Sequence, residues 1–190
     1  MKAIKSTKKA ALIILTSLIS VSIIIAALAI ILSPPKAVMK YKEASIDEKM
    51  YSYWLSYFKK ELMVENGISG SSDTPDFWNS EYSEGESYAE HLCKLADDRI
   101  KAKLVAVQMY DEYGQDLPDY AKDDIENYLS ELVDYVGDGS KEKLNGIAAD
   151  YGTDYNAIKR VAECDYKIEL LFNLRYGADG SYIREAEKDA

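Results

Sequence analysis

The order of apolar and polar residues separates one long apolar segment from a series of amphipathic segments. Residues 10–32, AALIILTSLISVSIIIAALAIIL, contain no charged side chain. Because a helix rises about 1.5 Å per residue, a segment of this length can cross a hydrocarbon core of about 30 Å. We therefore predict a transmembrane signal anchor at residues 10–32, which would be in contact with the lipid bilayer.

The charges on either side of the apolar segment predict its orientation. The lysines of residues 1–9 precede it, and the first acidic residue, Glu43, follows it. Basic flanks stay on the cytoplasmic side, so we expect residues 1–9 inside the cell and the rest outside, as in a single-pass protein of the cell membrane. Residues 27–29 (Ala-Leu-Ala) also have the small-residue form that signal peptidase cleaves, and cleavage is the alternative. Both interpretations place the residues after Ser33 beyond the cytoplasmic membrane.

A linker at residues 33–44 separates the apolar segment from the amphipathic part. Pro34 and Pro35 cannot continue a helix, and they stiffen the chain where it leaves the membrane. A brief strand could form between Val38 and Tyr41. The amphipathic part begins at residue 45.

An aromatic helix is predicted to start at Ser45, where Glu48 completes a capping box. Apolar residues recur along one face of it at the helical period: Met50, Trp54, Tyr57, Phe58 and Leu62. The predicted buried core of the helix consists of Met50, Trp54, Phe58 and Leu62. The same side chains could instead line a groove. Tyr51 and Leu55 widen the face beyond an ordinary apolar stripe, which raises the question of what the additional side chains contact.

Four further helices are expected after a polar loop, residues 67–86, that carries Phe77 and Trp78. Capping residues and glycines predict their limits: residues 87–113, 118–137, 141–151 and 153–177. The second of these four is expected to bury Ala121, Ile125, Tyr128, Leu129, Leu132 and Val136, and the third Leu144, Ile147 and Ala148. The predicted fold is all-α: a bundle of about five helices at residues 45–183, followed by a tail at residues 184–190.

The residue types that catalysis requires are scarce. His91 is the only histidine, and the sequence contains no nucleophile-elbow, phosphate-loop or zinc-protease motif. His91 and Cys93 could supply two metal ligands, but a structural zinc site needs four. We therefore expect that the protein is not an enzyme and that it binds no metal ion and no cofactor.

The charge of the outer part excludes one class of partner. Four of the 23 basic residues lie in residues 1–9 and all 33 acidic residues follow them, so the outer part carries a net charge of −14. Nucleic acid is not an expected partner, because its phosphates need a basic surface. The simplest explanation of the excess acid is a well-solvated exterior.

Two cysteines, Cys93 and Cys164, fall within predicted helices. In an oxidising compartment they could form a disulfide. Cysteine is also common as a small buried residue. The sequence leaves both alternatives open.

Five stretches carry a resemblance to a known family: IDEKMYSYWL (46–55), the Phe-Trp pair (77–78), GESY (85–88), LNGIAADYGTDYNAIKR (144–160) and YGADGSY (176–182). In this order, over residues 37–183, they resemble the N-terminal helical chaperone domain of SurA/PrsA-type extracytoplasmic foldases. The resemblance is in particular to anchored forms in Gram-positive, clostridia-like bacteria. The resemblance implies a fold like that of the SurA N-terminal domain.

The departures from this family are as informative as the resemblance. The family's complete members continue into a parvulin-type prolyl isomerase domain, for which the residues after Tyr182 are too few. Isomerase sites of that type also use histidines, and only His91 is present. The lipid-attachment cysteine of PrsA-like proteins is missing as well. We therefore expect the holding module without the isomerase.

The expected function is a membrane-anchored holdase that binds unfolded or newly exported polypeptides without catalysis. Tyrosine and tryptophan suit this role because they offer a large contact area and few rotatable bonds to immobilise. The candidate peptide-binding residues are the aromatic side chains least required for the core: Tyr51, Tyr53, Tyr57, Phe77 and Trp78. The alternative is a structural or adaptor module that docks one partner, either a separate foldase or a second copy in a homodimer.

Overall fold

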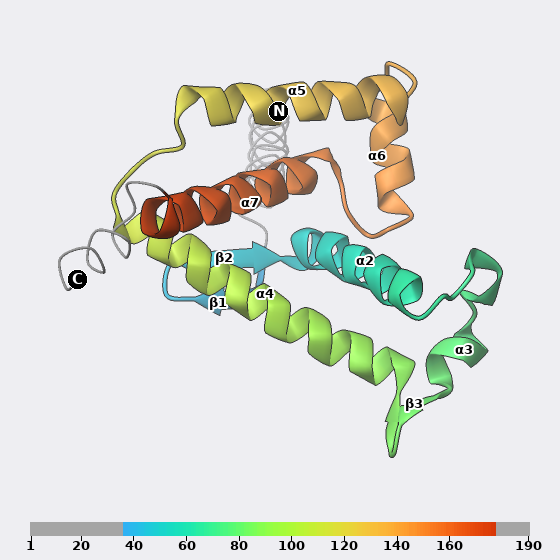
Figure 1. Ribbon diagram of the computed structural model, residues 1–190. Coiled ribbons are helices and arrows are strands. Elements are labelled where there is room, and N and C mark those ends of the chain that lie inside the picture. Colours follow the sequence, from blue (N-terminus) through green and yellow to red (C-terminus); the bar gives the residue numbers. More distant parts are fainter. Residues whose placement is uncertain (1–35, 178–190) are drawn as a thin grey trace, which may run out of the picture. The chain divides into compact units, whose positions relative to one another are not determined.

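The computed structural model describes residues 36–177 (Figure 1). The predicted cytoplasmic segment at residues 1–9, the anchor at residues 10–32 and the tail at residues 184–190 lie outside this range. Among the helices within it, none combines the length and the apolar character that crossing a membrane requires.

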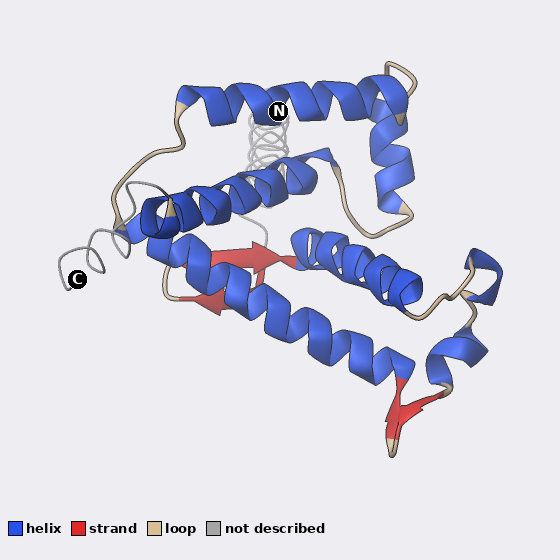
Figure 2. Ribbon diagram, in the orientation of Figure 1, coloured by secondary structure: helices blue, strands red, loops and turns tan. Residues whose placement is uncertain are grey.

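Helices dominate the described residues, as Figure 2 shows. Between residues 36 and 177 there are six α-helices: α2 (Glu48–Glu65), α3 (Pro75–Asn79), α4 (Tyr88–Glu112), α5 (Asp119–Tyr135), α6 (Lys141–Ala149) and α7 (Tyr155–Tyr176). Two antiparallel hairpins accompany them: β1 (Ala37–Tyr41) with β2 (Ala44–Asp47), and β3 (Glu81–Ser83) with β4 (Glu86–Ser87). The all-α prediction is confirmed for the fold class, but it did not include the two complete hairpins.

The first hairpin corrects the predicted start of the aromatic helix. Ser45 lies in β2 and is paired with Lys40 of β1, so it is not a helix cap. Asp47 has that role, since its Oδ1 accepts a hydrogen bond of 3.0 Å from the Met50 amide. The capping pattern at Ser45 was misleading because strand pairing fixes the backbone there in an extended conformation.

The main core forms where α2, α4 and α7 pack together against the first hairpin (Figure 1). α2 contributes four buried side chains, Met50, Trp54, Phe58 and Leu62. Buried residues from the other two helices include Ala96, Ile100, Leu104, Ala157 and Val161. Burying one large apolar side chain contributes roughly 1.5–3 kcal/mol, so this one face of α2 is enough to fix the helix on α4 and α7.

A smaller apolar cluster attaches α5 and α6 to α7. Its buried members are Ile125, Leu129, Ala148 and Ile158. In Figure 1, α5 runs along one side of α7, and α6 leads from the end of α5 back toward the start of α7. α5 and α6 therefore depend on one long helix for most of their cover, whereas α2 is packed between two.

The capping prediction was correct for α4 and wrong by one residue for α7. Ser87 and Glu90 form the predicted capping box at the start of α4. At α7 the cap is Asp154 rather than Thr153, because Asp154 Oδ1 accepts a hydrogen bond of 2.8 Å from the Ala157 amide.

Candidate functional site

α2 presents a second face that is distinct from its buried face. This second face carries Tyr53, Tyr57, Lys60 and Val64, at intervals of four, three and four residues. Side chains at these intervals lie one above another along a helix. Tyr57, in the middle of the face, is 52% exposed. The face is therefore open to other molecules.

An apolar groove with a volume of about 470 Å³ runs beside this face. Its lining comes from α2, from α5, from α6 with the turn after it, and from the start of α7: Tyr53, Ser56, Tyr57, Lys60, Tyr128, Leu132, Val136, Leu144, Ile147, Ala148, Tyr151, Thr153 and Ile158. Five large apolar side chains of this lining are exposed, namely Tyr57, Tyr128, Val136, Ile147 and Tyr151. Exposed apolar side chains that gather in one hollow are typical of a site for another molecule.

Two neighbouring hollows lengthen this groove along α2. The first is bordered by Tyr57 and Val64, and the second by Ser56 and Met63. Lys60 borders all three hollows, so they meet at this residue. We refer to the three hollows together as the α2 groove, to the 470 Å³ hollow as its central hollow and to the other two as its outer hollows.

The length of the α2 groove indicates what kind of molecule fits it. Tyr53 and Val64 lie eleven residues apart on α2, which corresponds to about 16 Å at the rise of a helix. An extended polypeptide covers that distance with about five residues. The groove is therefore suited to a short stretch of extended chain.

The lining of the central hollow is apolar, with little charge. Burial, together with the neighbouring Tyr128 hydroxyl, raises the pKa of Tyr53. A hydrogen bond to Glu61 raises the pKa of Tyr57. Both tyrosines are therefore neutral at physiological pH. Lys60 is then the one charged residue among the described residues that line the central hollow.

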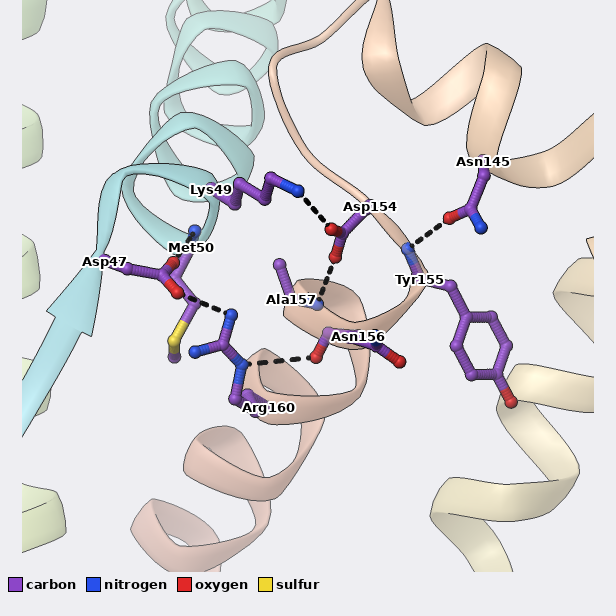
Figure 3. A network of polar contacts seen from close by, with 9 residues as sticks. All are labelled: Asp47, Lys49, Met50, Asn145, Asp154, Tyr155, Asn156, Ala157 and Arg160. Carbon is purple, nitrogen blue, oxygen red and sulfur yellow. Dashed lines mark hydrogen bonds and ion pairs between the residues drawn. The ribbon is translucent and has the colours of Figure 1, made fainter. Parts of the chain in front are cut away.

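A polar network at the starts of α2 and α7 connects the two helices (Figure 3). Asp47, the cap of α2, forms an ion pair of 2.7 Å with Arg160 of α7. Asp154, the cap of α7, forms an ion pair with Lys49 of α2. Burial alone would raise the pKa of Asp154, but hydrogen bonds from Lys49 and the Ala157 amide outweigh it and lower the pKa. Each helix thus supplies the cation for the other helix's capping aspartate.

Further contacts connect α6 and α5 to the same helix. Asn145 of α6 accepts a hydrogen bond of 2.8 Å from the Tyr155 amide at the start of α7 (Figure 3). The Lys141 ammonium lies 3.6 Å from the centre of the Tyr155 ring. On the other side, the Tyr166 hydroxyl of α7 donates to Asp124 of α5 over 3.0 Å. These contacts therefore tie α2, α5 and α6, which supply both walls of the groove, to α7.

Two of the five candidate aromatic residues, Tyr53 and Tyr57, border the α2 groove. Tyr51 does not line it, because its hydroxyl donates a hydrogen bond of 2.9 Å to Asp97 of α4. Burial and this hydrogen bond raise the pKa of Tyr51 to about 12. Tyr51 therefore serves the packing of α2 on α4.

Phe77 and Trp78 belong to a separate aromatic group around α3 and the second hairpin. The Phe77 ring centre lies 4.5 Å from that of Tyr88 and 5.1 Å from that of Trp78. Tyr82 stacks on His91 with 3.7 Å between their ring centres. These contacts hold the loop against the start of α4, as expected of aromatic residues in a polar loop. They place His91 partly inside this group rather than free on the surface.

The far wall of the groove contains residues whose role the sequence pattern did not reveal. The apolar pattern predicts Tyr128, Val136 and Ile147 on the inner sides of their helices, yet these residues are 40%, 43% and 43% exposed. The prediction was wrong because the apolar stripes on α5 and α6 are wider than the cover that α7 provides. The width of these apolar stripes is the one feature of the sequence that could have indicated an uncovered face on α5 and α6.

Cys93 and Cys164 are both free thiols. Lys103 of α4 forms an ion pair with Asp165, the neighbour of Cys164, and Cys93 lies ten residues before Lys103. Ten helical residues span about 15 Å, whereas a disulfide needs Cα atoms within about 7 Å. The disulfide that the sequence allows is therefore not formed in this structure.

A buried hydroxyl in the lining of the groove gives a stability prediction. Thr153 is 6% exposed, and its Oγ1 has no hydrogen-bond partner among residues 36–177. We expect Thr153→Val, which keeps the side-chain shape, to raise the free energy of unfolding by about 1 kcal/mol, because a buried unpaired hydroxyl is unfavourable. Denaturant unfolding of the full chain in lipid nanodiscs, followed by circular dichroism, measures the change. A clear loss of stability would mean that the hydroxyl has a partner.

Within residues 36–177, no three His, Cys, Asp or Glu side chains are grouped so that they could hold a metal ion.

No protein-family model matches the chain, and neither the curated proteins nor the solved structures include a significant match.

Proposed function

We propose that this protein is a holdase, which binds apolar segments of unfolded or newly exported polypeptides in the α2 groove without catalysis. The observation that carries the proposal is the gathering of five exposed apolar side chains along one preformed groove. A contiguous apolar surface of this kind is costly to leave in water, and it commonly marks a binding site. The length of the groove, which about five extended residues span, matches a segment of polypeptide.

The binding mode follows from the residue types. Tyrosine rings make a large contact with apolar side chains of many shapes, and their hydroxyl groups tolerate water at the edges of the groove. Binding through such contacts has little directional demand, so it suits clients of varied sequence. The net charge of −14 on the outer part opposes self-association of loaded complexes through like-charge repulsion.

The proposal extends to the location of the protein. Residues 10–32 would anchor it in the cell membrane and concentrate the groove where exported chains emerge. This part rests on the apolar sequence and its basic flank, together with the resemblance to the helical domain of SurA/PrsA-type foldases.

A matched pair of triple variants tests the proposed function. The groove variant combines Tyr57→Ser, Val136→Ser and Tyr151→Ser, and the control variant combines Val38→Ser, Tyr120→Ser and Tyr135→Ser. All six residues are exposed, but only the first three line the α2 groove. The full chain in nanodiscs is added to a reduced, aggregating client, and light scattering is recorded. Empty nanodiscs provide the blank.

We expect the groove variant to need about tenfold more protein than the wild type for the same suppression of aggregation. Loss of two aromatic contacts and one aliphatic contact should weaken the free energy of client binding by about 1.4 kcal/mol, which corresponds to a tenfold higher Kd. The control variant should act like the wild type. Equal activity of the two triple variants, or no suppression by the wild type at several-fold molar excess, would contradict the proposal.

A further inference from the structure

We infer that the α2 groove prefers apolar segments that carry one carboxylate, and that Lys60 recognises this carboxylate. The inference rests on the proposed function, because it names the class of segment that the groove selects. The occupant is an extended polypeptide with an acidic side chain between two apolar side chains.

The position of Lys60 is the first observation. It borders all three hollows of the α2 groove, so any segment that runs along the groove passes it. In the central hollow it is the only charged lining residue among those described, and its neighbours there include Tyr57 and Tyr128. Lys60 is itself exposed, but the apolar side chains beside it keep part of the water away from a bound carboxylate, which strengthens the ion pair relative to open water.

The second observation is that the ammonium of Lys60 is not neutralised within the described residues. Its sequence neighbour Lys59 forms an ion pair of 2.6 Å with Asp73. Glu61, which borders the outer hollow that contains Val64, forms an ion pair with Arg99. Among residues 36–177, no carboxylate lies within ion-pair distance of Lys60. Among the described residues that line the groove, Lys60 is thus the one basic side chain without an ion-pair partner.

Two other carboxylates share the outer hollows with Lys60. Glu65 borders the hollow beyond Tyr57, and Asp150 borders the hollow beyond Ser56. They stand at the outer parts of the groove rather than in its central hollow. They therefore disfavour acidic side chains in the two outer hollows and leave the central hollow, beside Lys60, as the place for a carboxylate.

The spacing along α2 defines the order of side chains in the segment. From Tyr57 to Lys60 the helix rises about 4.5 Å, and from Lys60 to Val64 about 6 Å. In an extended chain, side chains on the same face recur every 6–7 Å, which corresponds to two residues. A segment of the form apolar-x-acidic-x-apolar would therefore place its apolar side chains near Tyr57 and Val64 and its carboxylate near Lys60.

The overall charge of the protein makes this preference specific. A strongly acidic exterior repels acidic peptides at long range, but salt at 0.15 M screens that repulsion beyond about 8 Å. Contact with Lys60 takes place well inside this distance. The groove should therefore favour a single carboxylate within an apolar segment and should not favour polyacidic chains.

The test uses a heptapeptide, Ser-Phe-Ser-Glu-Ser-Leu-Ser, blocked at both ends and labelled with a neutral fluorophore, and a second peptide with glutamine at its centre. Fluorescence anisotropy gives the Kd of each peptide for the full chain in nanodiscs of zwitterionic lipid. The protein variants are Lys60→Gln and, as a matched control with the same change in charge, Lys40→Gln. Lys40 lies on β1 and borders none of the three hollows.

We expect the wild type and Lys40→Gln to bind the glutamate peptide about fivefold more tightly than the glutamine peptide, as for a partly exposed ion pair. In Lys60→Gln the two Kd values should become equal, with the Kd of the glutamine peptide unchanged within about twofold. Equal Kd values in the wild type would overturn the carboxylate preference and leave the proposed function intact. A preference that persists in Lys60→Gln would overturn the assignment to Lys60. Absence of binding by either peptide would count against the proposed function itself.

Discussion

Replacing Trp54 with alanine is expected to lower the free energy of unfolding by about 3–5 kcal/mol, the largest single effect we foresee. Trp54 is 2% exposed in the main core, between α2 and the two helices that cover it. Removing the indole eliminates its burial and leaves a cavity that the surrounding side chains fill only in part. Denaturant unfolding of the full chain in nanodiscs, followed by circular dichroism, gives the change in midpoint.

The matched control for Trp54→Ala is Tyr57→Ala on the same helix. Tyr57 points into the open groove, so its removal should change the free energy of unfolding by no more than about 0.5 kcal/mol. For peptide affinity we expect the opposite: the loss should be larger in Tyr57→Ala than in Trp54→Ala. Similar losses of stability in the two variants would mean that α2 does not divide into a core face and a groove face.

The division of α2 into two faces was only half predictable. The interval of four residues between Met50, Trp54, Phe58 and Leu62 is a local property of the sequence, and the structure buries all four side chains. Whether the adjacent face is covered depends on helices that come much later in the chain. No local pattern indicates that α5 and α6 leave Tyr57 on this face exposed.

The failures among the local predictions have a common physical cause. The pattern at Ser45 and Glu48 satisfies the capping rule, but a hairpin with residues before Ser45 has priority over it. The apolar stripe of α5 correctly identifies Ile125 and Leu129 as buried, and it misplaces Val136 because only one long helix covers α5. In each case, pairing with a distant or preceding segment decides between local options of similar energy.

The five candidate aromatic residues illustrate the same limit at the level of the site. They were chosen by residue type and by position outside the core stripe, and such a choice cannot separate neighbouring surfaces. The structure distributes them over three places: the groove for Tyr53 and Tyr57, the contact with Asp97 for Tyr51, and the group around α3 for the remaining pair. Residues on the opposite wall, such as Tyr151, become visible as partners of Tyr57 only in the folded chain.

Replacing Asp47 with alanine is expected to lower the free energy of unfolding by about 2–3 kcal/mol, which combines the loss of a helix cap with the loss of an ion pair. Asp47 is 5% exposed, and it both caps α2 and pairs with Arg160. Arg160 is partly exposed, so in the variant water can solvate the guanidinium that has lost its carboxylate partner. The full penalty for a buried unpaired charge therefore does not apply. Denaturant unfolding measures the sum of the two effects.

Two further substitutions separate these effects. Asp47→Asn retains a side-chain oxygen that can accept from the Met50 amide but lacks the charge for Arg160, so it should cost only about 1 kcal/mol. Asp154→Ala removes the cap of α7 and its ion pair with Lys49, and this more exposed site should also cost about 1 kcal/mol. Equal losses in Asp47→Ala and Asp154→Ala would show that burial of Asp47 adds nothing.

The same variants distinguish a network that only stabilises the fold from one that also shapes the groove. Asp47 and Arg160 join α2 to the helix that carries α5 and α6, so their contact fixes the distance between the two walls. If the groove is preformed by this contact, Asp47→Asn should weaken peptide binding under conditions in which the chain remains fully folded. An unchanged Kd in folded Asp47→Asn would instead mean that the smaller contacts, such as Asn145 with Tyr155, are sufficient to hold the walls apart.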